Sequence, residues 1–206
     1  MISIDSVTLD VNDLDAADAF YTAAFDVGAR VRLRAAHAPT AGFRGFTLSL
    51  LVSQRASVDS LIATALDAGA TSLKPAARQL WGGYSGVARA PDGTIWKVAT
   101  SAKKDAGPAT RRIDQIVLLL GVADMPATKQ FYVDRGLEVA KSYGRKYVEF
   151  AGPTTDGIKL ALYGHKALAK DAGVAADGTG SHRLAIGSDA GSFTDPDGFT
   201  WDTVTG

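Results

Sequence analysis

Two short segments, one near the end of each half of the sequence, carry the residues best suited to chemistry. Residues 90–97 read Ala-Pro-Asp-Gly-Thr-Ile-Trp-Lys, and residues 195–202 read Asp-Pro-Asp-Gly-Phe-Thr-Trp-Asp. Each is a Pro-Asp-Gly turn followed by a strand with a tryptophan and then a charged residue. The charged residues, Lys97 and Asp202, could transfer protons to a bound molecule, pair with each other or point into solvent. Their ordered recurrence predicts a duplicated architecture.

The elements that must position Lys97 follow from the periodicity of the first hundred residues. Residues 2–11 alternate between an apolar and a polar face, which predicts a half-buried strand. Asn12 or Asp13 can cap a helix over 13–25 that Gly28 closes. The remaining expectations are strands over 29–34 and 43–52, a helix from Val58 to Leu66 closed by Gly69, a loop over 78–84 and strand residues from 85 to 99.

The same order of elements then restarts. Residues 101–111 are small and polar and contain proline and glycine, which predicts a linker between residues 1–100 and 112–206. Residues 113–117 match the first strand, and Phe131-Tyr132 matches Phe20-Tyr21. Further expected elements are a helix beginning near Asp124, strands over 138–143, 147–151 and 158–163, a short helix over 166–171, and closing strands near 184–186 and 199–204.

Composition and charge exclude several classes of partner. The sequence has 22 basic and 22 acidic residues and a net charge of zero, so we expect no nucleic-acid partner. No run approaches the roughly 18 apolar residues of a membrane span, and the first residues lack a signal-peptide profile. We therefore expect a cytoplasmic protein with no membrane partner. The absence of cysteine excludes disulfides and thiolate metal sites.

The motifs together have the order found in one known superfamily. They are Ile4-Asp5-Ser6-Val7, Asp13, Phe20-Tyr21, residues 81–86 (Trp-Gly-Gly-Tyr-Ser-Gly), Pro91-Asp92-Gly93 and Trp96, then Ile113-Asp114-Gln115-Ile116, Asp124, Phe131-Tyr132 and residues 195–201. In this order they resemble the vicinal-oxygen-chelate superfamily, which includes glyoxalase I, bleomycin-resistance proteins, extradiol dioxygenases and methylmalonyl-CoA epimerase. The resemblance covers nearly the whole chain. It implies an α+β fold of two tandem βαβββ modules, with curled mixed sheets around a cleft and the helices packed outside.

The resemblance also implies where a metal ion would bind. Enzymes of the superfamily hold a divalent ion with four side chains from the first and last strand of each module. The first-strand positions fall on Ser6 and on Gln115, or on Val117 if the gap is placed differently, and the last-strand positions fall on Lys97 and Asp202. A lysine ammonium has no lone pair and repels a divalent ion, and a serine hydroxyl is a poor ligand. We therefore expect no metal at this site and no cofactor.

Aromatic and polar side chains remain as candidates for binding a ligand. Trp81 and Tyr84, in a loop that contains glycine, either stack on a flat organic molecule or hold the loop together. Arg44 or Arg145 could meet an acidic group on such a molecule. Trp96 and Trp201 alternate away from their charged neighbours and are expected in the core. The full set of cleft candidates is Ser6, Thr8, Phe46, Trp81, Tyr84, Lys97, Gln115, Tyr147, Tyr163 and Asp202.

Two classes of function fit these residues. The first is a metal-independent binding protein of the bleomycin-resistance kind, which holds a small organic, possibly aromatic, ligand in the cleft. The second is an enzyme of the superfamily, a lyase, isomerase or dioxygenase, with a displaced metal site or with proton transfer by Asp202 or Lys97. The degenerate metal positions favour binding. The cleft could close within one chain or between two copies in a homodimer.

Overall fold

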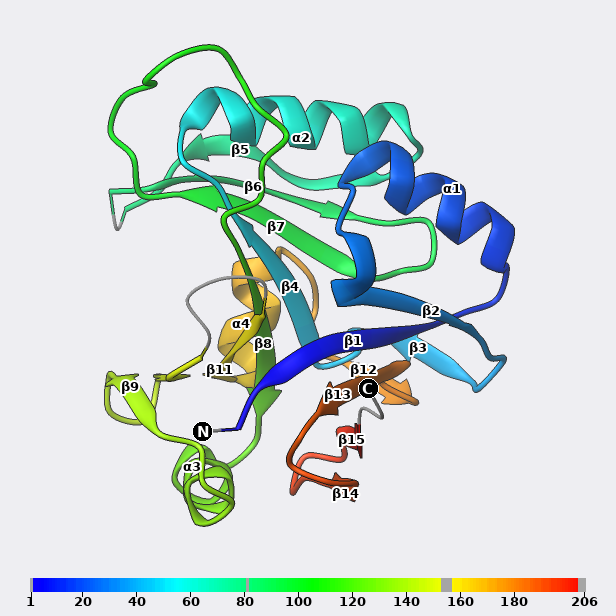
Figure 1. Cartoon of the computed structure of the whole chain (residues 1–206), viewed down its shortest axis with the longest axis vertical. Helices are drawn as coiled ribbons and strands as arrows, with labels where there is room; N and C mark the ends of the chain where they lie inside the picture. Colours follow the sequence, from blue (N-terminus) through cyan, green and yellow to red (C-terminus); the bar gives the residue numbers. More distant parts are fainter. Residues whose placement is uncertain (1, 81, 153–156, 204–206) are drawn as a thin grey trace.

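Two mixed β-sheets share one apolar core (Figure 1). The computed structural model describes residues 2–80, 82–152 and 157–203. The first half contains β1 (Ile4–Val11), α1 (Leu14–Ala24), β2 (Val31–Ala35), β3 (Thr40–Gly42), β4 (Phe46–Leu51), α2 (Arg55–Asp67), β5 (Thr71–Arg78), β6 (Tyr84–Arg89) and β7 (Ile95–Thr100). The second half contains β8 (Gln115–Val122), α3 (Met125–Asp134), β9 (Val139–Ser142), β10 (Tyr147–Phe150), β11 (Ile158–Gly164), α4 (His165–Ala172), β12 (Gly178–Gly180), β13 (Leu184–Ser188), β14 (Phe193–Thr194) and β15 (Thr200–Thr203).

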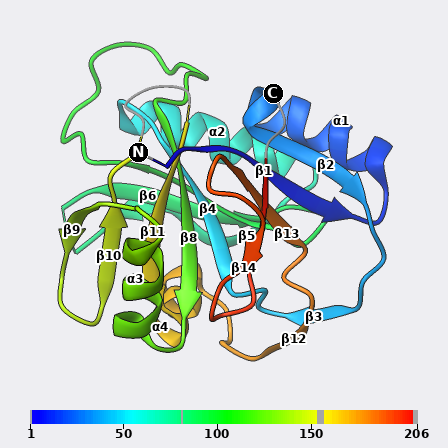
Figure 2. The ribbon, with the colours of Figure 1, turned by 60° about the horizontal axis from the view of Figure 1, so that its bottom comes forward.

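Each large sheet is built from both halves of the chain. The eight-stranded sheet has the order β5-β6-β7-β4-β8-β11-β10-β9, and the five-stranded sheet has the order β14-β15-β13-β1-β2. The short strands β3 and β12 form a third, two-stranded sheet, visible in Figure 2. The expected α+β fold with mixed sheets is confirmed. The halves do not form one sheet each, because β1 and β2 join strands from the end of the chain.

The two large sheets repeat one pairing pattern. In the larger sheet β7 is parallel to β4, β4 is antiparallel to β8, and β8 is parallel to β11. In the smaller sheet β15 is parallel to β13, β13 is antiparallel to β1, and β1 is parallel to β2. The two sheets therefore share one order of parallel and antiparallel pairs across four consecutive strands.

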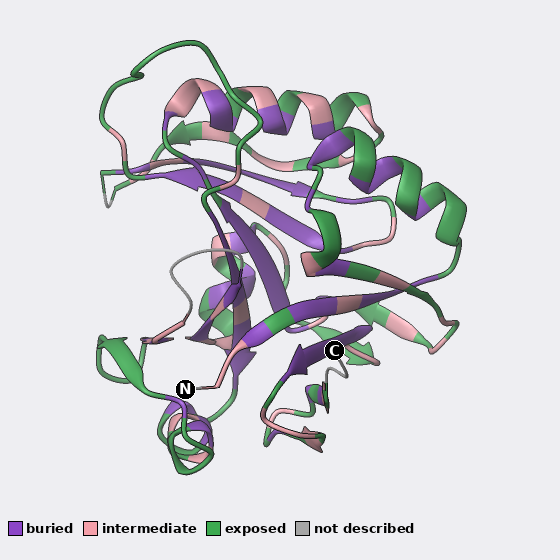
Figure 3. Ribbon diagram, in the orientation of Figure 1, coloured by how far each residue is buried: buried purple, intermediate pink, exposed green. Residues whose placement is uncertain are grey.

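The core fills the space between the two sheets and beneath the helices. Alternate residues of β1, β4 and β8 point into it, which gives the buried strands seen in Figure 3. Trp96 and Trp201 are completely buried there, as expected from their alternation with Lys97 and Asp202. Asp13 and Asp124 cap α1 and α3 by accepting hydrogen bonds from backbone amides. None of the helices described is long and apolar enough to cross a membrane.

A buried hydrogen-bond network links each Phe-Tyr helix to its Pro-Asp-Gly turn. In the first half, the Tyr21 hydroxyl donates to Asp92 Oδ2 at 3.0 Å and lies 3.4 Å from Trp96 Nε1, which donates to it. In the second half, the Tyr132 hydroxyl donates to Asp195 and accepts from Trp201 Nε1 at 3.2 Å. Helix, turn and final strand are thus joined by the residues that make up the repeated motif.

The second network uses a different aspartate from the first. Asp195 precedes the proline, whereas Asp92 follows it. The residue equivalent to Asp92 is Asp197, which accepts from the backbone amide of Ala123 and from Thr128 Oγ1. Burial raises the pKa of the Asp195 carboxyl, and hydrogen bonds from Tyr132 and from backbone amides oppose that rise.

The short strands β3, β12 and β14 were not expected from the sequence, and two longer segments also differ from expectation. Strand β5 was not expected, because Pro75 and the polar residues around it do not alternate clearly; β5 lies at the edge of the sheet, where proline is tolerated. The predicted linker, residues 101–111, is irregular but bound to α2. Gln54 at the start of α2 bonds to the carbonyl of Pro108 and the amide of Ala106, and Asp105 Oδ1 accepts from the amide of Ala56, so the linker satisfies a free amide at the helix terminus.

We predict that Tyr132→Phe destabilises the protein. The substitution leaves the buried Asp195 carboxylate and Trp201 Nε1 each short of one partner, so the free energy of unfolding should fall by about 1–3 kcal/mol. Urea denaturation followed by tryptophan fluorescence measures the change. The matched control is Tyr143→Phe on the exposed surface, expected to change stability by less than about 0.5 kcal/mol. Equal effects of the two substitutions would contradict a role for the network.

We also predict a pH-dependent contribution from Asp195. Its folded-state pKa is raised by burial, so as the pH rises above about 4 the carboxyl ionises first in the unfolded chain. The contribution of the protonated Asp195 carboxyl to stability is complete below that pH and is lost as the pH rises through its folded-state pKa. The stability of the parent relative to Asp195→Asn should therefore decline over this range, as measured by urea denaturation. If the difference in stability between the parent and Asp195→Asn does not depend on pH, the pKa of Asp195 is not raised by burial. The control is Asp18→Asn, on the exposed side of α1.

Candidate functional site

The face of the eight-stranded sheet that points away from the core carries four of the residues expected in a cleft. They are Lys97, Gln115, Tyr147 and Tyr163. Lys97 lies between Trp96 and Val98, which are both in the core, so its side chain leaves the sheet on the opposite side. We call this surface the outer face of the eight-stranded sheet.

Four side chains form a row across the centre of this outer face. Lys97 of β7 is in register with Ser49 of β4, Ser49 with Val117 of β8, and Val117 with Lys159 of β11. Ser49 and Val117 are buried, whereas both lysines are partly exposed. The row contains two cations, one hydroxyl and one aliphatic group. In the next row Gln115 is in register with Leu51, and its Nε2 donates to the carbonyl of Gly157 at 2.7 Å.

Helix α4 covers one end of the outer face. Its buried residues, Leu168, Ala169 and Ala172, pack in a second apolar cluster with Val87 and Ile95 of the sheet. Ala88 and Trp96, the next residues along those strands, lie in the main core with α2. The two helices α2 and α4 therefore pack on opposite faces of the same sheet.

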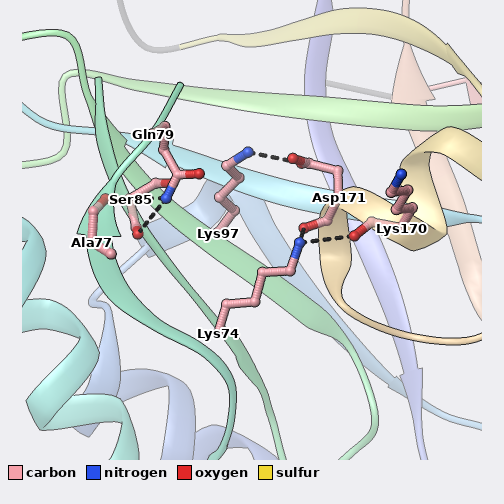
Figure 4. Close-up of polar contacts among 7 residues, drawn as sticks. All are labelled: Lys74, Ala77, Gln79, Ser85, Lys97, Lys170 and Asp171. Atoms are coloured by element: carbon pink, nitrogen blue, oxygen red, sulfur yellow. Dashed lines mark hydrogen bonds and ion pairs between the residues drawn. The ribbon is translucent and has the colours of Figure 1, made fainter. Parts of the chain in front are cut away.

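Two lysines hold the C-terminal end of α4 against the sheet (Figure 4). Lys97 Nζ lies 2.7 Å from Asp171 Oδ2. Lys74 Nζ donates to the carbonyls of Lys170 and Asp171 at 2.8 and 2.7 Å, where the helix dipole favours a cation. Gly173 ends the helix with a φ of 80°, a conformation that glycine adopts without strain.

Asp202 is not the partner of Lys97, contrary to one of the two sequence-based expectations. The two residues lie on different sheets, because β15 pairs with β13 and β7 pairs with β4. Ser6 and Thr8 share the five-stranded sheet with Asp202, and Ser6 and Asp202 both align with Gly187. The structure therefore divides the cleft candidates between two separate faces.

The outer face of the five-stranded sheet has its own ion pair. Asp10 Oδ1 lies 2.7 Å from Arg34 Nε. The hydrogen bond with Asp10 raises the pKa of Arg34, and Asp202 adds a smaller electrostatic contribution. The carboxylates on this face are therefore close to arginine; in the ion pair, the Arg34 side chain is 53% exposed and the Asp10 side chain only 11%.

Two aromatic candidates lie elsewhere. Phe46 points into the core on the same side of β4 as Leu48 and Leu50 and is 2% exposed. Tyr84 packs on the core side, where its hydroxyl donates to Asp59 of α2 at 2.7 Å. Neither side chain reaches the outer face, so the expectation of a cleft position is corrected for both. Trp81 lies outside the described residues.

Tyr147 and Tyr163 are neighbours on the outer face. They are in register across β10 and β11, with ring centroids 6.1 Å apart in an edge-to-face arrangement. Tyr147 donates to Glu149 Oε2 at 2.9 Å, and burial raises the pKa of its hydroxyl. Tyr163 also packs against the α4 cluster. Tyr143, which is 66% exposed, extends the aromatic surface towards β9.

The residues present do not fit the divalent metal site that the resemblance implies. Of the implied positions, Ser6, Lys97 and Gln115 or Val117 supply no anionic or imidazole ligand, and the one carboxylate, Asp202, lies on a different sheet from Lys97 and Gln115. In the described part of the chain, no three His, Asp or Glu side chains are grouped in a way that could hold a metal ion. The chemistry open to this face is ionic and aromatic contact with an organic molecule.

Sequence reasoning missed three residues of this site. Lys159 and Ser49 could have been found, because each lies two residues from another outward-facing position on its strand, such as Ala161 or Thr47. Asp171 could not have been found in this way. Its contact with Lys97 depends on where α4 lies on the sheet, which no local pattern encodes.

Comparison with solved structures identifies the fold. Glyoxalase I from Zea mays superposes with a TM-score of 0.64 at 17% sequence identity, over 98% of this chain and 91% of that chain. A protein from Bacillus subtilis, described as a proposed dioxygenase, superposes with a TM-score of 0.55 at 11% identity, over 90% of this chain and 69% of that one. No protein-family model matches the sequence, and no curated protein sequence does.

We predict that Lys97 and Asp171 stabilise the position of α4. Lys97→Glu should destabilise the protein, and Lys97→Glu combined with Asp171→Lys should recover part of the loss. Because the two side chains are 17% and 36% exposed, we expect a coupling free energy of about 1 kcal/mol. A double-mutant cycle measured by urea denaturation, together with hydrogen exchange of α4 amides, tests this. Lys166→Glu, on the exposed side of α4, is the control; absence of coupling would contradict the contact.

Proposed function

We propose that this chain, which has the vicinal-oxygen-chelate fold, binds a small organic molecule without a metal ion on the outer face of the eight-stranded sheet. The observation that supports the proposal best is the row Lys97, Ser49, Val117 and Lys159, which places one cation, Lys97, at a position where the resemblance implies a metal ligand and a second, Lys159, in the same row. A face with this composition favours an acidic group on the ligand rather than a divalent cation.

Lys159 is the residue best placed to meet that acidic group. The charge of Lys97 is already balanced by Asp171, whereas Lys159 has no acidic partner in the described residues. Lys159 is partly exposed, so its ammonium is accessible from solvent. A carboxylate bound beside Lys159 would gain a charge-assisted hydrogen bond.

The neighbouring tyrosines would supply an aromatic surface. Tyr147 is on the strand next to Lys159, and Tyr163 is on the same strand. A flat molecule can gain edge or face contact with such rings. The proposed ligand is therefore a small aromatic acid, with its carboxylate towards Lys159 and its ring towards the tyrosines.

The first test concerns the metal. Calorimetric titration with Ni²⁺, Co²⁺ and Zn²⁺, and metal analysis of the purified protein, should show no stoichiometric high-affinity site. Lys97→Glu is the variant to compare with the parent in the metal titrations, because it introduces a carboxylate, a possible metal ligand, into the central row. The parent protein could instead bind a metal ion tightly and stoichiometrically, and keep doing so after its histidines are substituted. That result would be compatible with a displaced metal site and would overturn this proposal.

The second test concerns the ligand. We predict that 2-naphthoate binds and raises the melting temperature, whereas 2-naphthol, which lacks the carboxylate, binds more weakly. Lys159→Glu should weaken naphthoate binding by about tenfold or more, because it removes a charge-assisted contact and adds repulsion. Lys146→Glu, in the exposed turn before β10, is the matched control. Equal affinities of the Lys159 and Lys146 variants would count against the outer face as the site.

A further inference from the structure

A cavity lies between α1, the Pro-Asp-Gly turn after β6 and the start of β13. Its volume is about 290 Å³. Val11, Ala17 and Phe20 form an apolar part of its lining, and Arg44 and Arg183 also line it. These residues are separate from the outer face of the eight-stranded sheet. The cavity therefore combines a small apolar surface with two cations.

Arg183 is a buried cation that contacts only neutral acceptors. It is 8% exposed, and its guanidinium donates to the carbonyl of Ala38 from Nε and Nη2, at 3.0 and 2.7 Å. Nη1 donates to Asn12 Oδ1 at 2.8 Å. The backbone of Arg183 has a φ of 53°, which is unfavourable for a residue other than glycine. The fold thus keeps this side chain in place at a cost in backbone energy.

Arg44 is the second cation, and one of its nitrogens has no partner. Nη2 donates to the backbone carbonyl of Asp92, whereas Nη1 is buried and has no hydrogen-bond acceptor in the described part of the chain. Gly93 allows this approach, because a Cβ there would lie 2.7 Å from Nη2. Burial lowers the pKa of Arg44; the negative charge of Asp92 opposes this shift, and the positive charge of Arg183 adds to it.

The two carboxylates that line the cavity are already satisfied by other donors. Asp92 accepts from the Tyr21 hydroxyl and from the amide and hydroxyl of Thr94. Asp13 caps α1 by accepting from the amide of Ala16. Neither arginine forms an ion pair within the described residues. Two nearby guanidinium groups that form no ion pair are costly to bury, and a bound anion would reduce that cost.

We propose that this cavity binds the carboxylate of a small aliphatic acid, with Arg44 and Arg183 as its cationic partners. Guanidinium groups present paired donors that match the two oxygens of a carboxylate. The apolar lining beside them would hold a carbon chain of a few atoms, in keeping with the small volume. The proposal is independent of the ligand proposed for the outer face.

Titration of the isotope-labelled protein with sodium butyrate, followed by NMR, tests this site. Butyrate should shift the amide signals of Asn12, Ala16 and the residues next to Arg44 and Arg183. Butyramide, which has the same size but no charge, should bind at least about tenfold more weakly than butyrate. Inorganic phosphate at equal ionic strength is the second comparison. Binding of butyramide as tight as that of butyrate, or tighter binding of phosphate, would overturn the assignment to a carboxylate.

Two variants test the residues separately. Arg44→Gln removes one charge and should weaken butyrate binding by about tenfold or more. Ala16→Leu narrows the cavity, keeps both arginines and should abolish binding even if Arg44→Gln fails to fold. Lys159→Glu and Arg78→Gln should leave the affinity unchanged, which separates this site from the outer face. Undiminished binding by Ala16→Leu, or by folded Arg44→Gln, would refute the proposal.

Discussion

The structure depends on the buried hydrogen bonds that tie a tyrosine on each Phe-Tyr helix to an aspartate at each Pro-Asp-Gly turn. Withdrawing a carboxylate from water is costly unless it is hydrogen-bonded, and Tyr21 and Tyr132 supply donors to the partly buried Asp92 and the buried Asp195. Because Trp96 and Trp201 donate to the same hydroxyls, their side chains must point into the core. The residues that follow them, Lys97 and Asp202, must then point out of the core.

The exchange of strands between the halves decides what each outward residue meets. If each half formed its own sheet, Lys97 and Asp202 could have faced one shared cleft. Instead the last strands of the chain pair with β1, and β4 pairs with β8, so the two residues occupy separate sheets. Helix α4 then brings Asp171 to Lys97. The fold is the same while a lysine, Lys97, stands at one implied metal-ligand position, so fold and function must be argued separately.

The zero net charge of the protein conceals an uneven distribution of paired and unpaired ions. On the two outer faces, Lys97 and Arg34 are each next to an aspartate. Near α1, by contrast, Arg44 and Arg183 are held by neutral carbonyl and amide oxygens. Total charge therefore says little about ligand binding in this chain. What matters is where a cation lacks an acidic partner and whether space for a ligand lies beside it.

The sequence by itself determined the local features of this protein. The alternation in β1, the aspartate caps of α1 and α3, the duplicated motif and the burial of both tryptophans all follow from patterns within a few residues. The outward position of Lys159 and the inward position of Phe46 were also encoded, since each follows the two-residue period of its strand. Only the tertiary structure decided which strands pair, that Asp171 meets Lys97, and that Arg44 and Arg183 share a cavity. Periodicity fixes the side of a strand on which a residue lies, whereas the partner opposite it depends on contacts between residues far apart in the chain.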